Sequence, residues 1–159
     1  MIDKRILNIL DDLKIEYRIV EHAATFTVAD ADKVFGEWTP MKSLLIRDRK
    51  KKIYLVIMRG DKQLNFKNFA DRIGTKDLGF VSREKLMELF SVEPGSVSLF
   101  GLIHENAKNV EVIIDENIVN SDNEVSFHPN DNTKSIFFAA ENVIKILDQL
   151  GNNYRLVDL

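Results

Sequence analysis

The stretch from Ser43 to Met58 has the sequence SLLIRDRKKKIYLVIM, in which two apolar runs flank a dense cluster of positive charge. Short runs of branched and aromatic apolar residues are typical of strands that are buried on both faces. A charged segment between two such runs is typical of an exposed turn. We therefore expect buried strands over residues 43–47 and 53–58, joined by a basic turn.

Helices and strands alternate along the rest of the chain. Apolar residues recur at helical spacing after Asp3, which is placed to cap the first helix. Asn65 and Gly74 stand where the N-cap and the C-terminal glycine of another helix belong, and Ser82 opens a further one. Together these patterns predict helices over residues 2–13, 27–36, 65–74, 82–90 and 140–150, and further strands over residues 17–20, 110–114, 125–127, 134–138 and 154–157.

The order of these elements predicts the fold class. Helices and strands are intermixed, and some strands are joined by hairpin-length connections, which indicates an α/β protein of the α+β type. We expect a mixed, largely antiparallel central sheet surrounded by helices. The sequence has no internal repeat and no linker rich in Gly, Pro or Ser. Residues 1–159 are therefore predicted to form a single domain.

Composition excludes several classes of protein. The 159 residues include no cysteine, which excludes disulfides, thiol nucleophiles and thiolate metal sites. No window approaches the ~18 consecutive apolar residues of a membrane span, and residues 1–13 lack the features of a signal peptide. We therefore expect a cytoplasmic protein without a membrane partner. The net charge of −3 argues against nonspecific coating of nucleic acid, although it leaves room for a local basic face.

Familiar catalytic signatures are absent from the sequence. It contains no phosphate-binding Gly-Lys-Ser/Thr loop, no dinucleotide glycine fingerprint and no Gly-x-Ser-x-Gly elbow. Its histidines, His22, His104 and His128, show no metal-ligand spacing. We therefore predict neither a metal nor a cofactor.

Three local features remain as candidates for chemistry. Lys42 directly precedes an apolar strand, where a lysine is either a surface side chain at a strand end or a functional amine. Residues 94–101, PGSVSLFG, form either a loop whose backbone approaches a ligand or a tight helix-to-strand connection. His128 precedes a proline, which favours an extended backbone, and it either faces a site or bonds within its turn.

The basic turn also has two interpretations. Its charges either form a solvated surface, or Arg47, Arg49 and Lys50 contact the phosphate backbone of a nucleic acid. A few phosphate contacts can position an RNA without making the whole protein basic.

Taken in order along the chain, these features resemble the YbaK/prolyl-tRNA synthetase-associated domain family, particularly its free-standing, prolyl-tRNA-deacylase-like branch. The resemblance runs from the first predicted helix to Leu159. The segments that carry it are EHAATFT (residues 21–27), KSLLIRD (42–48), RGDK (59–62), EPGSVSLFGLI (93–103) and FHPNDNT (127–133).

The resemblance implies a YbaK-like, aminoacyl-tRNA-deacylase-like fold and a trans-editing hydrolase. Its substrate would be mischarged tRNA, with alanine on proline tRNA as the first expectation, and its second partner would be prolyl-tRNA synthetase. Cysteine or another small residue on the same tRNA is an alternative, and so is a non-catalytic module that binds tRNA or a synthetase. A second site is needed because an apolar pocket discriminates small side chains by only ~1–3 kcal/mol. Monomer and homodimer both remain open.

The resemblance also implies roles for individual residues. The functional lysine of the family falls on Lys42, whose ammonium would bind the terminal phosphate or the developing oxyanion while the ribose hydroxyl assists. The family's Gly-x-x-x-Pro loop falls on residues 95–99, with Leu99 in place of proline, and Ser43 stands where relatives often have asparagine. The expected substrate contacts are Phe26, Ser43, Gly95, Ser96, Ser98, Leu99, Gly101 and His128. Phe26, Ile46, Met58 and Leu99 are candidates for pocket walls, with core packing as the alternative.

Overall fold

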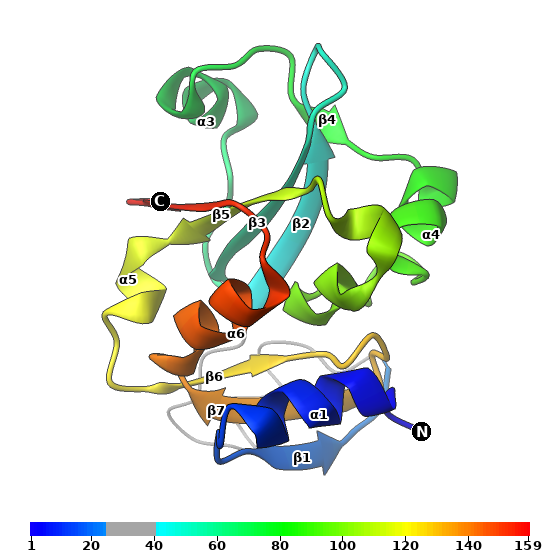
Figure 1. The fold of residues 1–159 in the computed structure, drawn as a ribbon. Coiled ribbons are helices and arrows are strands. Elements are labelled where there is room, and N and C mark those ends of the chain that lie inside the picture. The colour runs from blue at the N-terminus through cyan, green and yellow to red at the C-terminus, as the bar shows by residue number, and fades with distance from the viewer. Residues whose placement is uncertain (25–40) are drawn as a thin grey trace.

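The computed structural model describes residues 1–24 and 41–159. The helix expected over residues 27–36 and the candidate pocket residue Phe26 lie outside this part of the chain. The described strands form two sheets (Figure 1). The α+β class is confirmed, but the strands that we expected in one central sheet are divided between these two.

The larger sheet has five strands in the order β4-β2-β3-β5-β8. Strands β2 and β3 form an antiparallel hairpin around the basic turn, and the short β4 adds antiparallel to the end of β2. Strands β5 and β8 join in parallel on the other side. The bounds are β2 Met41–Arg47, β3 Ile53–Arg59, β4 Gly79–Phe80, β5 Glu111–Asp115 and β8 Tyr154–Val157.

The smaller sheet has three antiparallel strands in the order β1-β7-β6. Its strands β6 and β7 are joined by the turn that begins at His128, as the sequence predicts. The bounds are β1 Arg18–Glu21, β6 Glu124–Phe127 and β7 Lys134–Ala139. The strand segments of this sheet were predicted correctly, whereas the division of strands between the two sheets depends on pairings between residues that are far apart in the sequence.

The predicted helix caps at Asp3, Asn65, Gly74 and Ser82 are confirmed, whereas the last helix begins at Asn142 rather than at Ala140. Asp3 caps the first helix by accepting a 2.9 Å hydrogen bond from the Arg5 amide. Asn65 and Ser82 cap their helices in the same way, and Gly74 ends its helix with φ of 78°. The helices are α1 Lys4–Asp12, α3 Phe66–Ile73, α4 Arg83–Phe90, α5 Glu116–Val119 and α6 Asn142–Leu150, with 3₁₀ turns η1 Leu99–Ile103 and η2 Glu105–Ala107.

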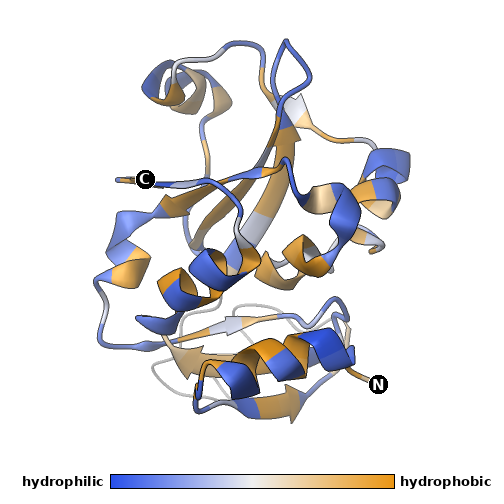
Figure 2. Cartoon of the chain, in the orientation of Figure 1, coloured by the Kyte–Doolittle hydropathy of each residue, from blue (hydrophilic) through white to orange (hydrophobic). Residues whose placement is uncertain are grey.

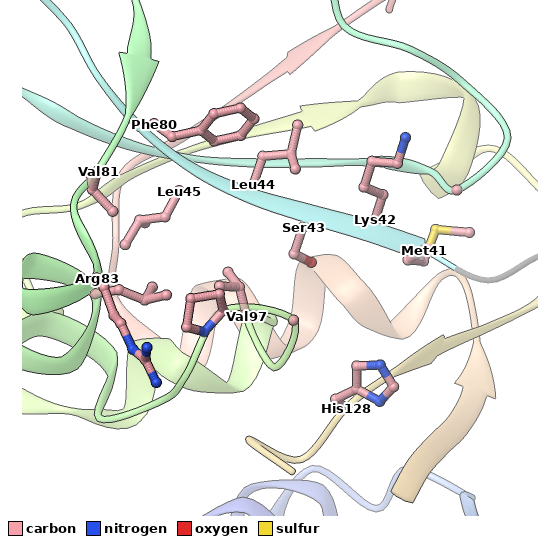
Figure 3. A pocket seen from close by; sticks show the side chains of 14 residues that line it. Met41, Lys42, Ser43, Leu44, Leu45, Phe80, Val81, Arg83, Val97 and His128 are labelled. Carbon is pink, nitrogen blue, oxygen red and sulfur yellow. The ribbon is translucent and has the colours of Figure 1, made fainter. Parts of the chain in front are cut away.

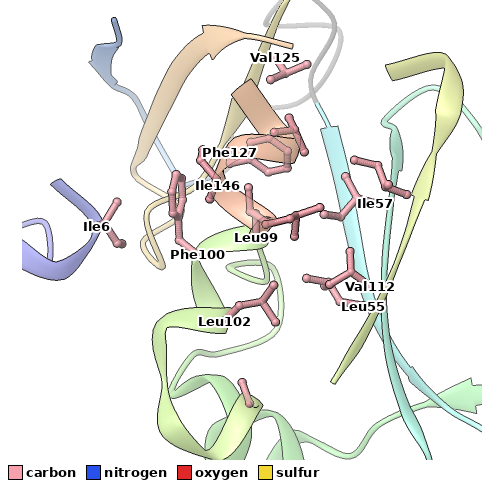
Figure 4. Close-up of a cluster of buried hydrophobic side chains, with 14 of the residues drawn as sticks. Ile6, Leu55, Ile57, Leu99, Phe100, Leu102, Val112, Val125, Phe127 and Ile146 are labelled. Carbon is pink, nitrogen blue, oxygen red and sulfur yellow. The ribbon is translucent and has the colours of Figure 1, made fainter. Parts of the chain in front are cut away.

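Apolar residues pack on both faces of the β2–β3 hairpin. On one face, Leu55 and Ile57 belong to a large core cluster that also holds Leu99 and Phe127 (Figure 4). On the other face, a smaller cluster joins Ile46, Tyr54, Val56 and Met58 to Phe69 and Ile73 of α3. Burial on both faces explains why these strands are continuous apolar runs rather than alternating ones.

In the described part of the chain, no helix combines the length and the apolar character that a membrane crossing requires.

Candidate functional site

A cavity of about 520 Å³ opens beside strand β2 (Figure 3). It lies where the loop after α4 and the turn after β6 approach the first half of β2. Its lining consists of Met41, Lys42, Ser43, Leu44, Leu45, Gly60, Phe80, Val81, Arg83, Leu86, Pro94, Gly95, Val97 and His128.

The cavity follows the edge of β2 that faces β4, and this edge is open as far as the described residues are concerned. Strand β4 pairs only with Ile46 and Arg47, so no described residue pairs with the first half of β2 on that side. The Val81 amide donates to the Leu45 carbonyl at 3.3 Å, which shows that Leu45 directs its backbone groups to this edge. The backbone N–H and C=O groups of successive residues point alternately to the two edges of an antiparallel strand. Ser43, two residues before Leu45, therefore presents its N–H and C=O to the same edge.

Lys42 and Ser43 lie on opposite faces of β2, because successive side chains of a strand alternate. Figure 3 shows the Ser43 side chain on the side of Val97 and His128, and the Lys42 amine on the other side with Leu44. The half-buried Lys42 ammonium donates a hydrogen bond of 2.7 Å to the backbone carbonyl oxygen of Lys62. This hydrogen bond fixes the Lys42 side chain at the end of the β2–β3 hairpin that lies opposite the basic turn.

Lys62 is itself anchored by its side chain. Its ammonium lies 2.8 Å from the carboxylate of Asp115, which is fully buried, and 2.6 Å from the backbone oxygen of Leu159. Burial alone would raise the pKa of Asp115, but the Lys62 ammonium and the Asn117 amide hold that pKa below its ordinary value. The buried carboxylate is therefore charged, and it fixes the residue whose carbonyl holds Lys42.

The loop after α4 brings its backbone to the cavity. Gly95 has φ of 95°, a conformation that favours glycine, and it is exposed at the cavity wall. Behind it, the buried Ser98 hydroxyl donates to the His128 carbonyl oxygen at 2.5 Å and accepts from the Phe100 amide at 3.0 Å. This hydroxyl ties the loop to the turn that carries His128.

His128 presents a neutral imidazole to the cavity. Its Nδ1 lies 2.8 Å from the Lys134 carbonyl oxygen, which can only accept a hydrogen bond, so Nδ1 carries the proton and Nε2 keeps its lone pair. Burial lowers the pKa of His128 below its ordinary value, which favours this neutral form. The centroid of the His22 ring lies 5.8 Å from that of the His128 ring, so two imidazoles are neighbours here.

The structure therefore gathers some of the predicted site residues and separates others. Lys42, Ser43, Gly95 and His128 line the cavity together. Other predicted contacts lie behind its wall and are buried: Ser96, Ser98, Leu99 and Gly101.

The burial of Leu99 and Gly101 has a packing explanation. The Leu99 side chain is fully buried in the large core cluster, as are Ile46 and Met58 within the core. A Cβ on Gly101 would lie 2.1 Å from the ring of Phe90, so this glycine makes room for an aromatic side chain. The side chains of Leu99, Ile46 and Met58 therefore pack in the core and do not line the cavity.

The basic turn lies at the far end of the β2–β3 hairpin, where Figure 2 shows a hydrophilic tip. Arg47 is five residues from Lys42 along β2, or about 17 Å. Arg49 is paired with Asp77 at 2.7 Å, whereas Lys50 is exposed. The predicted tRNA contacts at Arg47, Arg49 and Lys50 are thus outside the cavity, although they lie on the same hairpin.

Several residues of the site were not found from the sequence. Phe80, Val81 and Arg83 reach the cavity from β4 and the start of α4, and β4 is too short to give a strand pattern. Lys62 lies in the RGDK segment that carries part of the resemblance, but its contact with Asp115 spans 53 residues. Among residues 1–24 and 41–159, no group of three or more His, Asp or Glu side chains is arranged to hold a metal.

Comparison with known proteins identifies the family. The family model described as "Aminoacyl-tRNA editing domain" matches residues 22–146. The "Prolyl-tRNA editing protein ProX" of Acetoanaerobium sticklandii is 33% identical over 153 residues, which cover 94% of this chain and 93% of that protein. The "Prolyl-tRNA synthetase associated domain-containing protein 1" of Danio rerio is 24% identical, over 92% of this chain and 81% of its own.

Solved structures share the fold. The hypothetical protein APE2540 superposes with a TM-score of 0.74 at 19% identity, covering 96% of this chain and 98% of its own. A candidate trans-editing enzyme for prolyl tRNA synthetase superposes with a TM-score of 0.72 at 19% identity, covering 98% and 96%. The resemblance found in the sequence is thus confirmed: the chain belongs to the aminoacyl-tRNA editing domain family and is an aminoacyl-tRNA deacylase.

Proposed function

We propose that this chain removes alanine from mischarged proline tRNA by hydrolysing the ester bond between the amino acid and the terminal ribose. The observation that supports this best is the meeting of Lys42, Gly95 and His128, which are far apart in the sequence, in one cavity beside an open strand edge. A relative of similar length, ProX, is described as a prolyl-tRNA editing protein, which supports proline tRNA as the carrier.

The role that we propose for Lys42 is charge stabilisation. An aminoacyl ester is already activated, so the protein needs to orient it and to stabilise the charge that develops. An ammonium that donates to the Lys62 carbonyl still has further N–H groups for a phosphate or an oxyanion. Covalent attack by the amine is not required, and the neighbouring ribose hydroxyl would help to position the attacking water.

The amino acid would lie on the face of β2 that carries the Ser43 side chain, opposite to Lys42. The Ser43 backbone offers a donor and an acceptor there, and Gly95 brings a second stretch of backbone close to it. A neutral His128, with its lone pair on Nε2, suits acceptance of a hydrogen bond from the substrate's amine or ribose hydroxyl. We propose that His128 orients the substrate and does not act as a general base.

The replacement of the family's loop proline by Leu99 raised the alternative of a non-catalytic module. Leu99 begins the 3₁₀ turn η1, and its side chain is fully buried in the core. The substitution therefore concerns packing behind the cavity rather than the groups that line it, which favours the hydrolase. Cysteine or another small residue on the same tRNA remains the alternative substrate, with a synthetase as an additional partner in the cytoplasm.

A panel of mischarged tRNAs tests the proposal. The purified chain is incubated with alanine, cysteine, serine and proline on proline tRNA, and with alanine on alanine tRNA, while the remaining ester is measured over time. We expect fastest hydrolysis of alanine on proline tRNA and slow loss of the correctly charged tRNAs. Faster hydrolysis of the cysteine ester would select the alternative substrate. Binding of tRNA without hydrolysis of any ester would select the module.

A further inference from the structure

One exposed aromatic side chain at the cavity is not used by the chemistry proposed above. Phe80, in the short strand β4, lines the cavity and is 61% exposed. Its ring is nevertheless held in place, because Phe66 contacts it edge-on with the ring centroids 5.2 Å apart. A large apolar ring that is both ordered and open to solvent offers one face to a ligand.

Phe80 lies on the same face of the sheet as Lys42. It pairs directly with Ile46, and directly opposed residues of neighbouring strands share a face. Ile46, Leu44 and Lys42 alternate along that face of β2, so Phe80 lies about 13 Å from Lys42 with Leu44 between them. Figure 3 shows Phe80, Leu44 and Lys42 along one side of the strand.

The size of the cavity indicates that more than an amino acid enters it. Its volume of about 520 Å³ lies within the range of sites for drug-sized ligands, ~300–1,000 Å³, and greatly exceeds the needs of a methyl side chain. On the face of β2 that carries Lys42, the wall beyond the lysine is apolar and consists of Leu44 and Phe80. A flat, largely apolar group that is attached to the ester end would fill this part.

The charges beyond Phe80 suit an anionic chain. Arg47 pairs with Gly79, which precedes Phe80, and its side chain lies on the opposite face of the sheet from Phe80 and Lys42. The exposed Lys50 and Lys51 follow in the turn. Proteins that hold single-stranded nucleic acid combine an aromatic ring for a base with cations for the backbone. The order of Lys42, Phe80 and the basic turn has this arrangement.

We infer that Phe80 is a stacking platform for the terminal nucleobase of the tRNA acceptor end. In this arrangement the substrate folds around the open edge of β2. Its amino acid lies on the Ser43 and His128 side, its ester end lies at Lys42, and its terminal base lies flat on Phe80. This inference rests on the proposed function, because it takes aminoacyl-tRNA as the ligand.

Binding of an uncharged RNA tests the inference without relying on hydrolysis. The probe is an acceptor-stem minihelix of proline tRNA with its natural single-stranded end, compared with the same RNA lacking only the terminal base. Stacking of one base on an aromatic side chain is worth about 5- to 150-fold in Kd, equivalent to ~1–3 kcal/mol. We expect the wild-type chain to lose this factor when the base is removed.

Substitutions assign the effect to the ring. Phe80→Leu keeps an apolar side chain and should bind both RNAs with the same weakened affinity, whereas Phe80→Trp should preserve the preference for the intact end. Leu156→Ala is the matched control, since Leu156 is 45% exposed on β8 at the opposite edge of the sheet and should behave as wild type. An unchanged preference in Phe80→Leu, or no preference in the wild type, would overturn the inference.

These outcomes are separable from those of the hydrolysis panel. A chain that hydrolyses alanine on proline tRNA but ignores the terminal base would retain the proposed function without the platform. A chain that shows the base preference but hydrolyses no ester would retain the platform in a binding module.

Discussion

The side chain of Lys42 is held by the main chain of Lys62, whose carbonyl oxygen accepts its hydrogen bond at 2.7 Å. Lys62 is in turn fixed by the buried carboxylate of Asp115 at 2.8 Å. The Lys42 amine is thus held by way of a charge that does not line the cavity. Because Asp115 also caps α5 through the Asn117 amide, the orientation of Lys42 is linked to the body of the fold.

Replacement of Lys42 by alanine should abolish most of the activity and leave the fold intact. Removal of one preorganised group that stabilises developing charge costs about 10²- to 10³-fold in kcat. Lys42 is half-buried at an open edge, so its truncation should leave the melting temperature close to that of the wild type. Single-turnover deacylation and thermal melting measure the two effects. Lys42→Arg, which keeps the charge, should retain more activity, and near-normal turnover of Lys42→Ala would refute the proposed role.

Replacement of Lys62 by methionine should reduce stability and activity together. It leaves the fully buried Asp115 carboxylate without its cation, and breaking a buried pair costs ~3–5 kcal/mol. Because the Lys62 side chain is 31% exposed, solvent screens the pair, and we expect the free energy of unfolding in urea to fall by a smaller amount of about 2–3 kcal/mol. Glu88→Ala is the control, since it breaks the exposed pair with Lys85 and should change stability by less than ~0.5 kcal/mol. Full activity in Lys62→Met would show that Lys42 needs no such support.

Stability should fall as the pH drops from 7.5 to 5.5. Burial lowers the pKa of both His128 and His104 in the folded protein, whereas the unfolded side chains titrate near ~6.5. As the pH falls through that value, the unfolded state binds protons first, and stability is lost until the lowered folded pKa is passed. Each histidine contributes at most ~1.4 kcal/mol per pH unit in this window.

Urea unfolding at several pH values measures this effect, and two variants separate the histidines. His128→Asn and His104→Asn should each flatten part of the pH dependence. A wild-type slope in both variants would show that neither buried ring causes it.

Two glycines of the same loop should respond differently to alanine. Gly101→Ala places a Cβ 2.1 Å from the Phe90 ring, and overpacking of a core typically costs ~1–3 kcal/mol or more. Gly95→Ala brings its Cβ only into an ordinary van der Waals contact with the Asn132 side chain at 4.0 Å, but its φ of 95° disfavours a side chain and its Cβ would stand at the cavity wall. We expect a lower melting temperature for Gly101→Ala, and a larger loss of deacylation per degree of melting temperature for Gly95→Ala. The reverse order would contradict the assignment of Gly101 to core packing and of Gly95 to the cavity wall.

Local signals were sufficient for most of the elements. The β2–β3 hairpin followed from its continuous apolar runs, and the helix ends at Asp3, Asn65 and Ser82 followed from capping chemistry. Lys42 and His128 were weak candidates on local physics, and only the family resemblance connected them. The structure places both at one cavity.

Long-range pairings could not be predicted from the sequence. Nothing local to β7 indicates that it pairs with β1 and β6 rather than with the strands of the larger sheet. The same limitation applies to Lys62 and Asp115, whose contact joins segments 53 residues apart, and to Phe80, whose strand has only two residues. Each depends on which surfaces become neighbours after folding, and a single sequence carries no direct record of that.

Within residues 1–24 and 41–159, the first half of β2 has no partner strand on the side of β4, which has a consequence for the behaviour of the protein at high concentration. Unpaired backbone groups at a strand edge are a template on which a second chain can add a strand, and natural proteins often block such edges with a lysine. Lys42 places a charge on this segment of β2, so the amine to which we assign a role in editing would also oppose edge-to-edge aggregation. Selection for a soluble protein and selection for a functional site would then act on the same side chain.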